Sequence, residues 1–162
     1  MKTRIFSVLC ENSPGVMMRV SRDFTRRQIN LDSVTVGIEP SGLARMIFVF
    51  NADDHMAEHL HRVLSRLTQV INVEFIDPRS SIVREVALLK TKKLSDKQMW
   101  EVIQQVEKAG GRVLASKDNV LVVELSGIHE DIENVIKTIG PDVLQETARS
   151  GQVYLARETP ER

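Results

Sequence analysis

Apolar and polar residues alternate with two different periods along the first half of the chain. Four runs alternate every second residue, as half-buried strands do, and they cover residues 4–10, 29–38, 43–51 and 70–76. Two apolar stripes at helical spacing lie between them, formed by Val16, Val20 and Phe24 and then by Met56, Leu60, Val63, Leu64 and Leu67. Residues 39–42 are typical of a turn between the second and third runs. The first half therefore predicts the order β-α-β-β-α-β.

The second half repeats this order. Its strand-like runs cover residues 83–90, 112–116, 120–125 and 143–148, and residues 151–155 extend the last run. Ser95 and Gln98 have the spacing of a capping box at the start of a helix, which Gly110-Gly111 ends. A last apolar stripe covers residues 128–139, and Gly140-Pro141 terminates it.

Two successive βαββαβ units predict a tandem of ferredoxin-like α/β sandwiches, in which each antiparallel sheet has two helices on one face. A polar stretch containing Pro78 follows the first unit and indicates an interdomain link. We expect a first domain over residues 1–77, a linker over 78–83 and a second domain over 84–162. The uncovered sheet faces and edges need a partner, so we expect self-association through the sheets.

The junction between the first strand and the first helix, residues 11–20, predicts a small binding site. Asn12 or Ser13 is expected to cap the helix. Pro14 suits the first turn, and Gly15 leaves the backbone uncovered by any side chain. Free backbone N–H groups at the positive end of a helix dipole favour a carboxylate or phosphate. A well-capped helix that binds no ligand fits the same residues.

Composition and charge narrow the class of protein. The chain has 162 residues, of which 42% are apolar and 27% charged, as in globular proteins. Its 22 basic residues balance 22 acidic ones, which argues against nucleic acid or an anionic membrane as the main partner. Cys10 is the single cysteine, so no disulfide framework is expected. With no signal-like or membrane-spanning apolar segment in the sequence, we expect a cytoplasmic protein.

The search for catalytic or metal-binding chemistry yields one cluster of histidines. His55 and His59 have the i, i+4 spacing of a zinc-binding pair, and His61 lies close by. However, Glu58 does not follow His55 directly, and no third ligand is evident. The favoured interpretation is a solvated helix face without metal, and no catalytic pattern is recognised elsewhere in the sequence.

Several segments resemble one known family. Asn12-Ser13-Pro14-Gly15-Val16 matches the ligand loop of ACT domains, which reads acidic or Asn, any residue, Pro-Gly, apolar. The resemblance to the regulatory small subunit of acetolactate synthase (acetohydroxyacid synthase) is found in residues 7–12, 24–27, 30–37, 45–46, 84–90 and 146–151. It therefore appears in both halves, in the same order as in the family.

This resemblance implies a regulatory protein that is not itself an enzyme and has no cofactor of its own. Members of the family bind and activate a catalytic large subunit, which uses thiamine diphosphate, Mg²⁺ and FAD. They also confer feedback inhibition by valine or a related branched-chain amino acid, and they form a homodimer through their ACT domains. The effector residues implied for this sequence are Asn12, Ser13, Pro14, Gly15 and Val16 of one chain and Asn30 of the other.

One departure from the family pattern concerns the turn before the second strand. Gln28 stands where the family has glycine, so Gln28 either adopts a left-handed conformation or the turn is rebuilt.

Two other classes remain open from the sequence. A freestanding ACT-type amino-acid sensor, acting on another enzyme or a transcription factor, shares the fold and the Pro-Gly loop. A metal-responsive or catalytic domain requires the helix histidines to be ligands.

Overall fold

The computed structural model describes residues 1–157 and divides into two compact units. Unit 1 comprises Met1–Ile82 together with the described residues from Gln152 onward, and unit 2 comprises Val83–Gly151. The sequence pattern grouped the segment after Gln152 with the second half, and the last five residues of that expected domain, 158–162, lie outside the described part. No helix in residues 1–157 is long and apolar enough to span a membrane.

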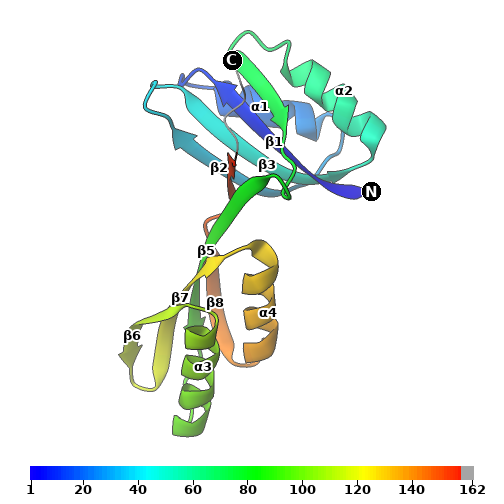
Figure 1. Cartoon of the computed structure of the whole chain (residues 1–162). Helices are drawn as coiled ribbons and strands as arrows, with labels where there is room; N and C mark the ends of the chain where they lie inside the picture. The colour runs from blue at the N-terminus through cyan, green and yellow to red at the C-terminus, as the bar shows by residue number, and fades with distance from the viewer. Residues whose placement is uncertain (158–162) are drawn as a thin grey trace. The chain divides into compact units, whose positions relative to one another are not determined.

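Unit 1 is an α/β sandwich with the predicted order of elements. These elements are β1 (Lys2–Cys10), α1 (Val16–Thr25), β2 (Leu31–Ile38), β3 (Ala44–Ala52), α2 (Asp54–Leu64) and β4 (Val70–Phe75). Its antiparallel sheet has the strand order β2-β3-β1-β4, which leaves β2 and β4 at the edges. Both helices pack on one face of this sheet (Figure 1).

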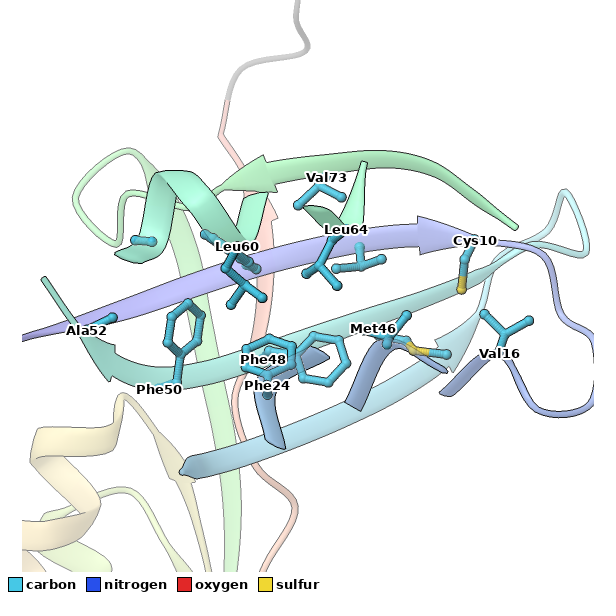
Figure 2. Close-up of a cluster of buried hydrophobic side chains, with 14 of the residues drawn as sticks. Cys10, Val16, Phe24, Met46, Phe48, Phe50, Ala52, Leu60, Leu64 and Val73 are labelled. Carbon is cyan, nitrogen blue, oxygen red and sulfur yellow. The ribbon is translucent and has the colours of Figure 1, made fainter. Parts of the chain in front are cut away.

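The core of unit 1 forms where the alternating strands meet the two helix stripes. The fully buried aromatic rings of Phe24 and Phe48 stack with centroids 4.9 Å apart, and Phe50 meets Phe24 edge-on at 5.2 Å. Leu60 and Leu64 of α2 close the same cluster (Figure 2). Such pairs contribute about 0.5–1.5 kcal/mol beyond the burial of their area.

Unit 2 repeats the architecture. Its elements are β5 (Ser81–Thr91, which begins in unit 1), α3 (Asp96–Lys108), β6 (Arg112–Lys117), β7 (Val120–Gly127), α4 (His129–Ile139) and β8 (Leu144–Arg149). The strand order is β6-β7-β5-β8, and β9 (Val153–Ala156) also pairs with β5. Both expected antiparallel sheets and the tandem ferredoxin-like topology are therefore confirmed.

Helices α1 and α3 end in the same hydrogen-bonded motif. After α1, the N–H of Ile29 donates to the carbonyl of Phe24 at 3.1 Å, and the N–H of Gln28 donates to that of Thr25 at 3.0 Å. This Schellman pattern requires a left-handed residue, and Gln28 adopts φ 55°. The first alternative for Gln28 is thereby confirmed.

The corresponding turn after α3 uses glycine. Gly110 has φ 74°, and the N–H of Gly111 donates to the carbonyl of Val106 at 2.8 Å. A Cβ on Gly111 would lie 2.6 Å from the carbonyl oxygen of Glu124 and 2.6 Å from a methyl group of Leu125. The two adjacent glycines thus have different roles, since the first supplies the left-handed conformation and the second permits close packing.

We predict that Gln28→Gly stabilises unit 1 by about 1 kcal/mol, because glycine enters the left-handed region without the cost borne by other residues. Thermal unfolding of unit 1 should shift upward by about 4–8 °C. The matched control is Gln28→Ala, which removes the same side chain but keeps the Cβ. An equal gain in Gln28→Ala would show that the side chain, not the backbone conformation, limits stability.

Candidate functional site

The loop after β1 forms a tight turn that leads directly into α1. Gly15 has φ 85° and ψ −6°, and the N–H of Val16 donates to the carbonyl of Ser13 at 3.4 Å. These values fit a type II β-turn with Pro14 and Gly15 at its two central positions. Val16 is buried and anchors the turn to the core, whereas Asn12 to Gly15 are exposed. The turn therefore presents its backbone at the surface.

The prediction that Asn12 or Ser13 caps α1 is wrong. The N-cap is Gly15, and no side chain accepts a hydrogen bond from the first turn of the helix. Pro14 also precedes the helix instead of lying in its first turn. The tight turn explains this error. Its left-handed residue Gly15 occupies the N-cap position, so Asn12 and Ser13 lie too early in the chain to cap the helix.

The N-terminus of α1 differs from those of the other helices in residues 1–157. Helices α2 and α3 have side-chain caps, Asp53 and Ser95, and each has an acidic residue in its first turn. Helix α4 lacks a side-chain cap but carries Glu130 and Asp131 there. Helix α1 has neither a cap nor an acidic residue. The positive end of its dipole is thus not offset by a side-chain cap or by an acidic residue of its first turn.

The structure does not bring Asn30 to this loop within one chain. Asn30 directly precedes β2, whose first residue Leu31 pairs with Phe50 of β3. The loop leaves the opposite end of the sheet, where Cys10 and Ile38 both pair with Ala44. The two ends of β2, Leu31 and Ile38, are seven residue steps apart, which corresponds to about 23 Å.

An apolar surface borders the loop, and sequence reasoning missed its exposure. Met17 and Met18 of α1 are 47% and 75% exposed, and Val36 and Ile38 of the edge strand β2 are 46% and 67% exposed. Periodicity placed all four on elements of the fold but could not show that nothing covers them. Large apolar residues gathered beside an unpaired edge are typical of a protein interface.

The histidines of α2 do not converge on a common point. His61 has its Nε2 2.9 Å from the carbonyl oxygen of Val73, and its ring stacks on Phe75. His59 lies near Arg27 of α1, with 3.4 Å between Nε2 and a guanidinium nitrogen. Within residues 1–157, no three His, Cys, Asp or Glu side chains are placed to hold a metal ion.

Comparison with known proteins identifies the family. Residues 6–72 match the family described as AHAS small subunit-like ACT domain, and residues 84–158 match the family described as small subunit of acetolactate synthase. A probable acetolactate synthase small subunit from Methanothermobacter thermautotrophicus is 33% identical over 156 residues, covering 96% of this chain and 93% of that protein. The chain belongs to the family of acetolactate synthase small subunits.

Other members of this family match nearly the whole length of the chain. An acetolactate synthase small subunit from Mycobacterium bovis is 34% identical over 157 residues, covering 96% of this chain and 93% of that protein. The crystal structure of the acetolactate synthase small subunit from Thermotoga maritima superposes with a TM-score of 0.87 at 32% identity. That superposition covers 98% of this chain and 99% of the other, so both units share the family's fold.

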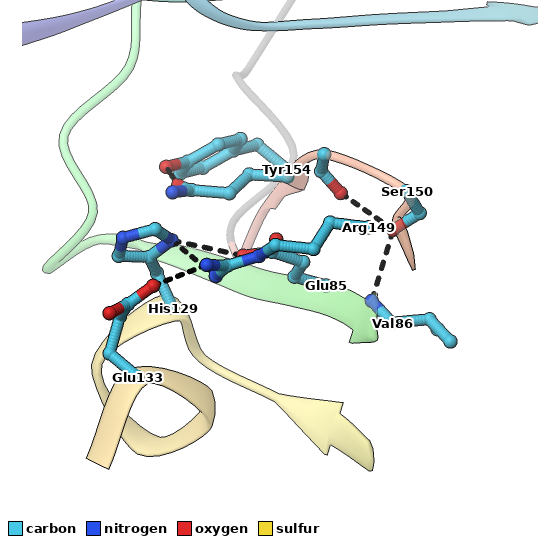
Figure 3. A network of polar contacts seen from close by, with 9 residues as sticks. Glu85, Val86, His129, Glu133, Arg149, Ser150 and Tyr154 are labelled. Atoms are coloured by element: carbon cyan, nitrogen blue, oxygen red, sulfur yellow. Dashed lines mark hydrogen bonds and ion pairs between the residues drawn. The ribbon is translucent and has the colours of Figure 1, made fainter. Parts of the chain in front are cut away.

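Unit 2, which contains most of the segment matched to the second family description, has an ion-pair network around the buried carboxylate of Glu85. The Glu85 carboxylate, 3% exposed as a side chain, accepts from Arg149 at 2.6 and 3.1 Å. His129 Nδ1 lies 3.0 Å from the same carboxylate, and Arg149 also pairs with Glu133 (Figure 3). The network fastens β5, β8 and the start of α4 together.

The pKa of Glu85 reflects opposing influences. Burial raises the pKa of this carboxyl. Hydrogen bonds from Arg149 and His129, together with the charges of these two groups, lower the pKa by more than burial raises it, so the net shift is downward. The pKa of Arg149 is raised, chiefly by its hydrogen bond to Glu85. The folded state therefore favours the ionised pair.

We predict that Glu85→Gln lowers the free energy of unfolding at pH 7 by about 1.5–3 kcal/mol. A lowered carboxyl pKa stabilises the fold above the unfolded pKa of about 4.3, and this stabilisation is lost as the pH falls through the folded pKa. Denaturant unfolding from pH 7 to pH 3 should show a shallower acid loss in Glu85→Gln than in the parent. Glu146→Gln, on the exposed strand β8, is the control. Parallel pH profiles for parent and Glu85→Gln would refute the role of this carboxylate.

Proposed function

We propose that this chain activates the thiamine-diphosphate-dependent catalytic subunit of acetolactate synthase and confers feedback inhibition by valine or a related branched-chain amino acid. Its membership of the small-subunit family supports the partner, because a small subunit implies a large one. Thiamine diphosphate, Mg²⁺ and FAD then belong to that catalytic partner. The observation that carries the effector site is the uncompensated N-terminus of α1.

The chemistry of the loop fits an amino-acid carboxylate. The backbone N–H groups of Met17 and Met18 have no hydrogen-bond partner among the described residues, and no acidic side chain opposes an anion in this turn. Donors of this kind favour a carboxylate through both hydrogen bonding and the helix dipole. The exposed methionines supply adaptable apolar surface for an aliphatic side chain.

A second copy of the chain would complete the site. If two β2 edges pair antiparallel about a two-fold axis, the start of one β2 lies beside the end of the other. Asn30 of the partner chain then comes to the end of the sheet that carries the loop of residues 12–16. The same pairing covers Val36 and Ile38, which accounts for their exposure in the single chain. The Asn30 side-chain carbonyl can accept a hydrogen bond from the effector's ammonium group.

We predict that Gly15→Asp raises the valine concentration for half-maximal inhibition at least tenfold, about 1.4 kcal/mol, because its carboxylate repels that of the effector. The positive φ of Gly15 makes any side chain here cost about 1–2 kcal/mol, although nothing lies within 4 Å of an added Cβ. Gly15→Asn is therefore the control, since it imposes the same backbone strain without charge. Acetolactate formation by the reconstituted pair provides the measurement.

Two results would contradict this assignment. Equal valine sensitivity in Gly15→Asp and the parent would show that the effector does not bind at this loop. Valine binding without any activation of the catalytic subunit would instead favour a freestanding amino-acid sensor.

We further predict that the chain is a dimer at micromolar concentration and that Ile38→Asp makes it monomeric. The substitution places a carboxylate in the proposed β2–β2 contact, where burial without a partner is costly. Ile71→Asp on the opposite edge strand β4 is the matched control, because Ile71 is similarly exposed at 56%. Native mass spectrometry measures the assembly. A monomeric parent, or an Ile38→Asp variant that remains a dimer, would exclude this interface.

A further inference from the structure

The helices of unit 1 carry a group of exposed arginines that have no partner. Helices α1 and α2 contact each other on one face of the sheet (Figure 1). Five exposed arginines lie on these helices or in the turns that end them: Arg19, Arg22, Arg26, Arg62 and Arg66. Within residues 1–157, none of these five side chains forms an ion pair or a hydrogen bond. We call these five residues the arginine face.

The three arginines of α1 form a stripe on the flank that faces α2. Their positions, 19, 22 and 26, fall within about 60° of one another around a helix of 3.6 residues per turn. Asp23 borders this stripe and pairs with Arg27 at 3.2 Å. Arg27 in turn lies 3.4 Å from Nε2 of His59 on α2. The stripe therefore lies beside the contact between the two helices.

The two arginines of α2 approach the same contact from the other side. Arg62 and Arg66 both fall within about 60° of His59 around the helix. Since His59 meets α1, all five cations border one helix–helix contact. The pairs at i, i+4, Arg22 with Arg26 and Arg62 with Arg66, repel each other and destabilise a helix. An anion bound between them would relieve this repulsion.

The acidic side chains of the same helices do not neutralise the arginine face. Three of them pair with another cation or cap a helix: Asp23, Asp54 and Asp53. Glu58 is exposed and lies four residues before Arg62, but no ion pair joins the two. Because the whole chain carries no net charge, the arginine face results from segregation of charge and not from a basic composition.

The helix dipole accounts for only part of this positive charge. Cations in the last turn offset the negative end of a helix, and α3 and α4 each have one lysine there, Lys108 and Lys137. Each helix of unit 1 instead has two arginines in its last turn or directly after it. Arg19 lies in the first half of α1, where the dipole gives a cation no benefit. The excess is suited to an anionic partner.

We propose that the arginine face docks a carboxylate-rich surface of the catalytic subunit. The identity of this partner rests on the proposed function, and its acidic chemistry rests on the charge of the face. Arginine presents a planar fork of donors that matches a carboxylate in two-point contacts. Arginine is also enriched at protein interfaces, where lysine is depleted, and α1 and α2 contain no lysine.

Other occupants fit this surface less well. A two-fold contact between two arginine faces would set cations opposite cations, which disfavours a second copy in this place. The helices of unit 2 carry acids, but Lys97, Lys108 and Lys137 lie among them, so their charge is mixed. A nucleic acid is disfavoured because the chain has no net positive charge and because α1 and α2 expose no aromatic ring for base stacking.

Charge changes of both signs test the arginine face in the full chain. The double variant Arg22→Glu/Arg62→Glu should weaken binding of the catalytic subunit at least tenfold at about 50 mM salt, and the loss should shrink at about 0.5 M salt. Glu58→Gln should instead tighten binding about twofold, because it removes the carboxylate nearest to Arg62 in the helix. A gain in affinity cannot arise from partial unfolding, so damage to the fold cannot produce both results.

The matched control is the double variant Lys108→Glu/Lys137→Glu. It makes the same charge change at exposed residues in the last turns of the two helices of unit 2. We expect its affinity for the catalytic subunit to equal that of the parent. Equal losses in the two double variants would overturn the docking surface, because the effect would then belong to the net charge of the chain.

A spin label placed in the arginine face reports the contact directly. Cys10 is buried, so a thiol-reactive nitroxide attaches selectively to the new cysteine of Glu58→Cys, a variant that keeps all five arginines. The electron paramagnetic resonance spectrum of this label should broaden when the catalytic subunit is added, since docking restricts the motion of the label. The same label on Lys137→Cys should keep its spectrum.

The outcomes separate this inference from the proposed function. If Arg22→Glu/Arg62→Glu binds and activates the catalytic subunit as the parent does, the docking surface is wrong and the proposed function stands. If the parent forms no complex at concentrations well above micromolar, both are overturned. Binding of the parent to duplex DNA or to anionic lipid vesicles that is lost in this double variant, while catalytic-subunit binding is kept, would assign the face to another polyanion and overturn the proposal.

Discussion

The central ladder between β1 and β3 determines where the functional residues of unit 1 stand. Its register is unbroken from Lys2 opposite Ala52 to Cys10 opposite Ala44, and β2 and β4 are added to either side of it. The ladder aligns the end of β1 with the end of β2, and it holds the start of β2 at the far end of the sheet. A ligand that contacts both the loop after Cys10 and Asn30 therefore requires two chains. The geometry of one sheet thus makes dimerisation a condition for the proposed effector site.

The two units share one architecture, but the N-termini of their first helices, α1 and α3, differ in capping and in charge. In unit 2 the start of α3 is satisfied by the Ser95–Gln98 capping box, and Asp96 adds a negative charge. In unit 1, Pro14 and Gly15 form the type II turn, and α1 has neither a side-chain cap nor an acidic residue in its first turn. A capped and acidic helix start stabilises its own unit but repels a carboxylate, whereas the uncapped start forgoes about 1 kcal/mol of stability. The helix start of unit 1, where the amino-acid site is proposed, therefore differs in charge from the matching place in unit 2.

Local patterns predicted most of the elements, while features that depend on distant residues could not be predicted. The third strand was expected over residues 43–51 and is Ala44–Ala52, because alternation and the preceding turn are both local signals. Met18 and Met46 have the same side chain, yet one is 75% and the other 4% exposed, and tertiary packing alone decides this. The Glu85–Arg149 pair joins residues 64 positions apart, a separation at which no periodicity acts. The N-cap of α1 was mispredicted because several polar residues compete for that position and only the backbone angle of Gly15 resolves the choice.

The surface proposed for dimerisation has its physical cause in the edge of one sheet. The edge strand β2 exposes Val36 and Ile38, and the neighbouring helix α1 exposes Met17 and Met18. An apolar edge of this kind favours aggregation unless a specific partner covers it. Strand β2 has Asp32 near its start and no cation within Leu31–Ile38, so pairing of two β2 strands brings no cations opposite one another. Charge and apolar surface thus both suit β2 to a second copy of the chain.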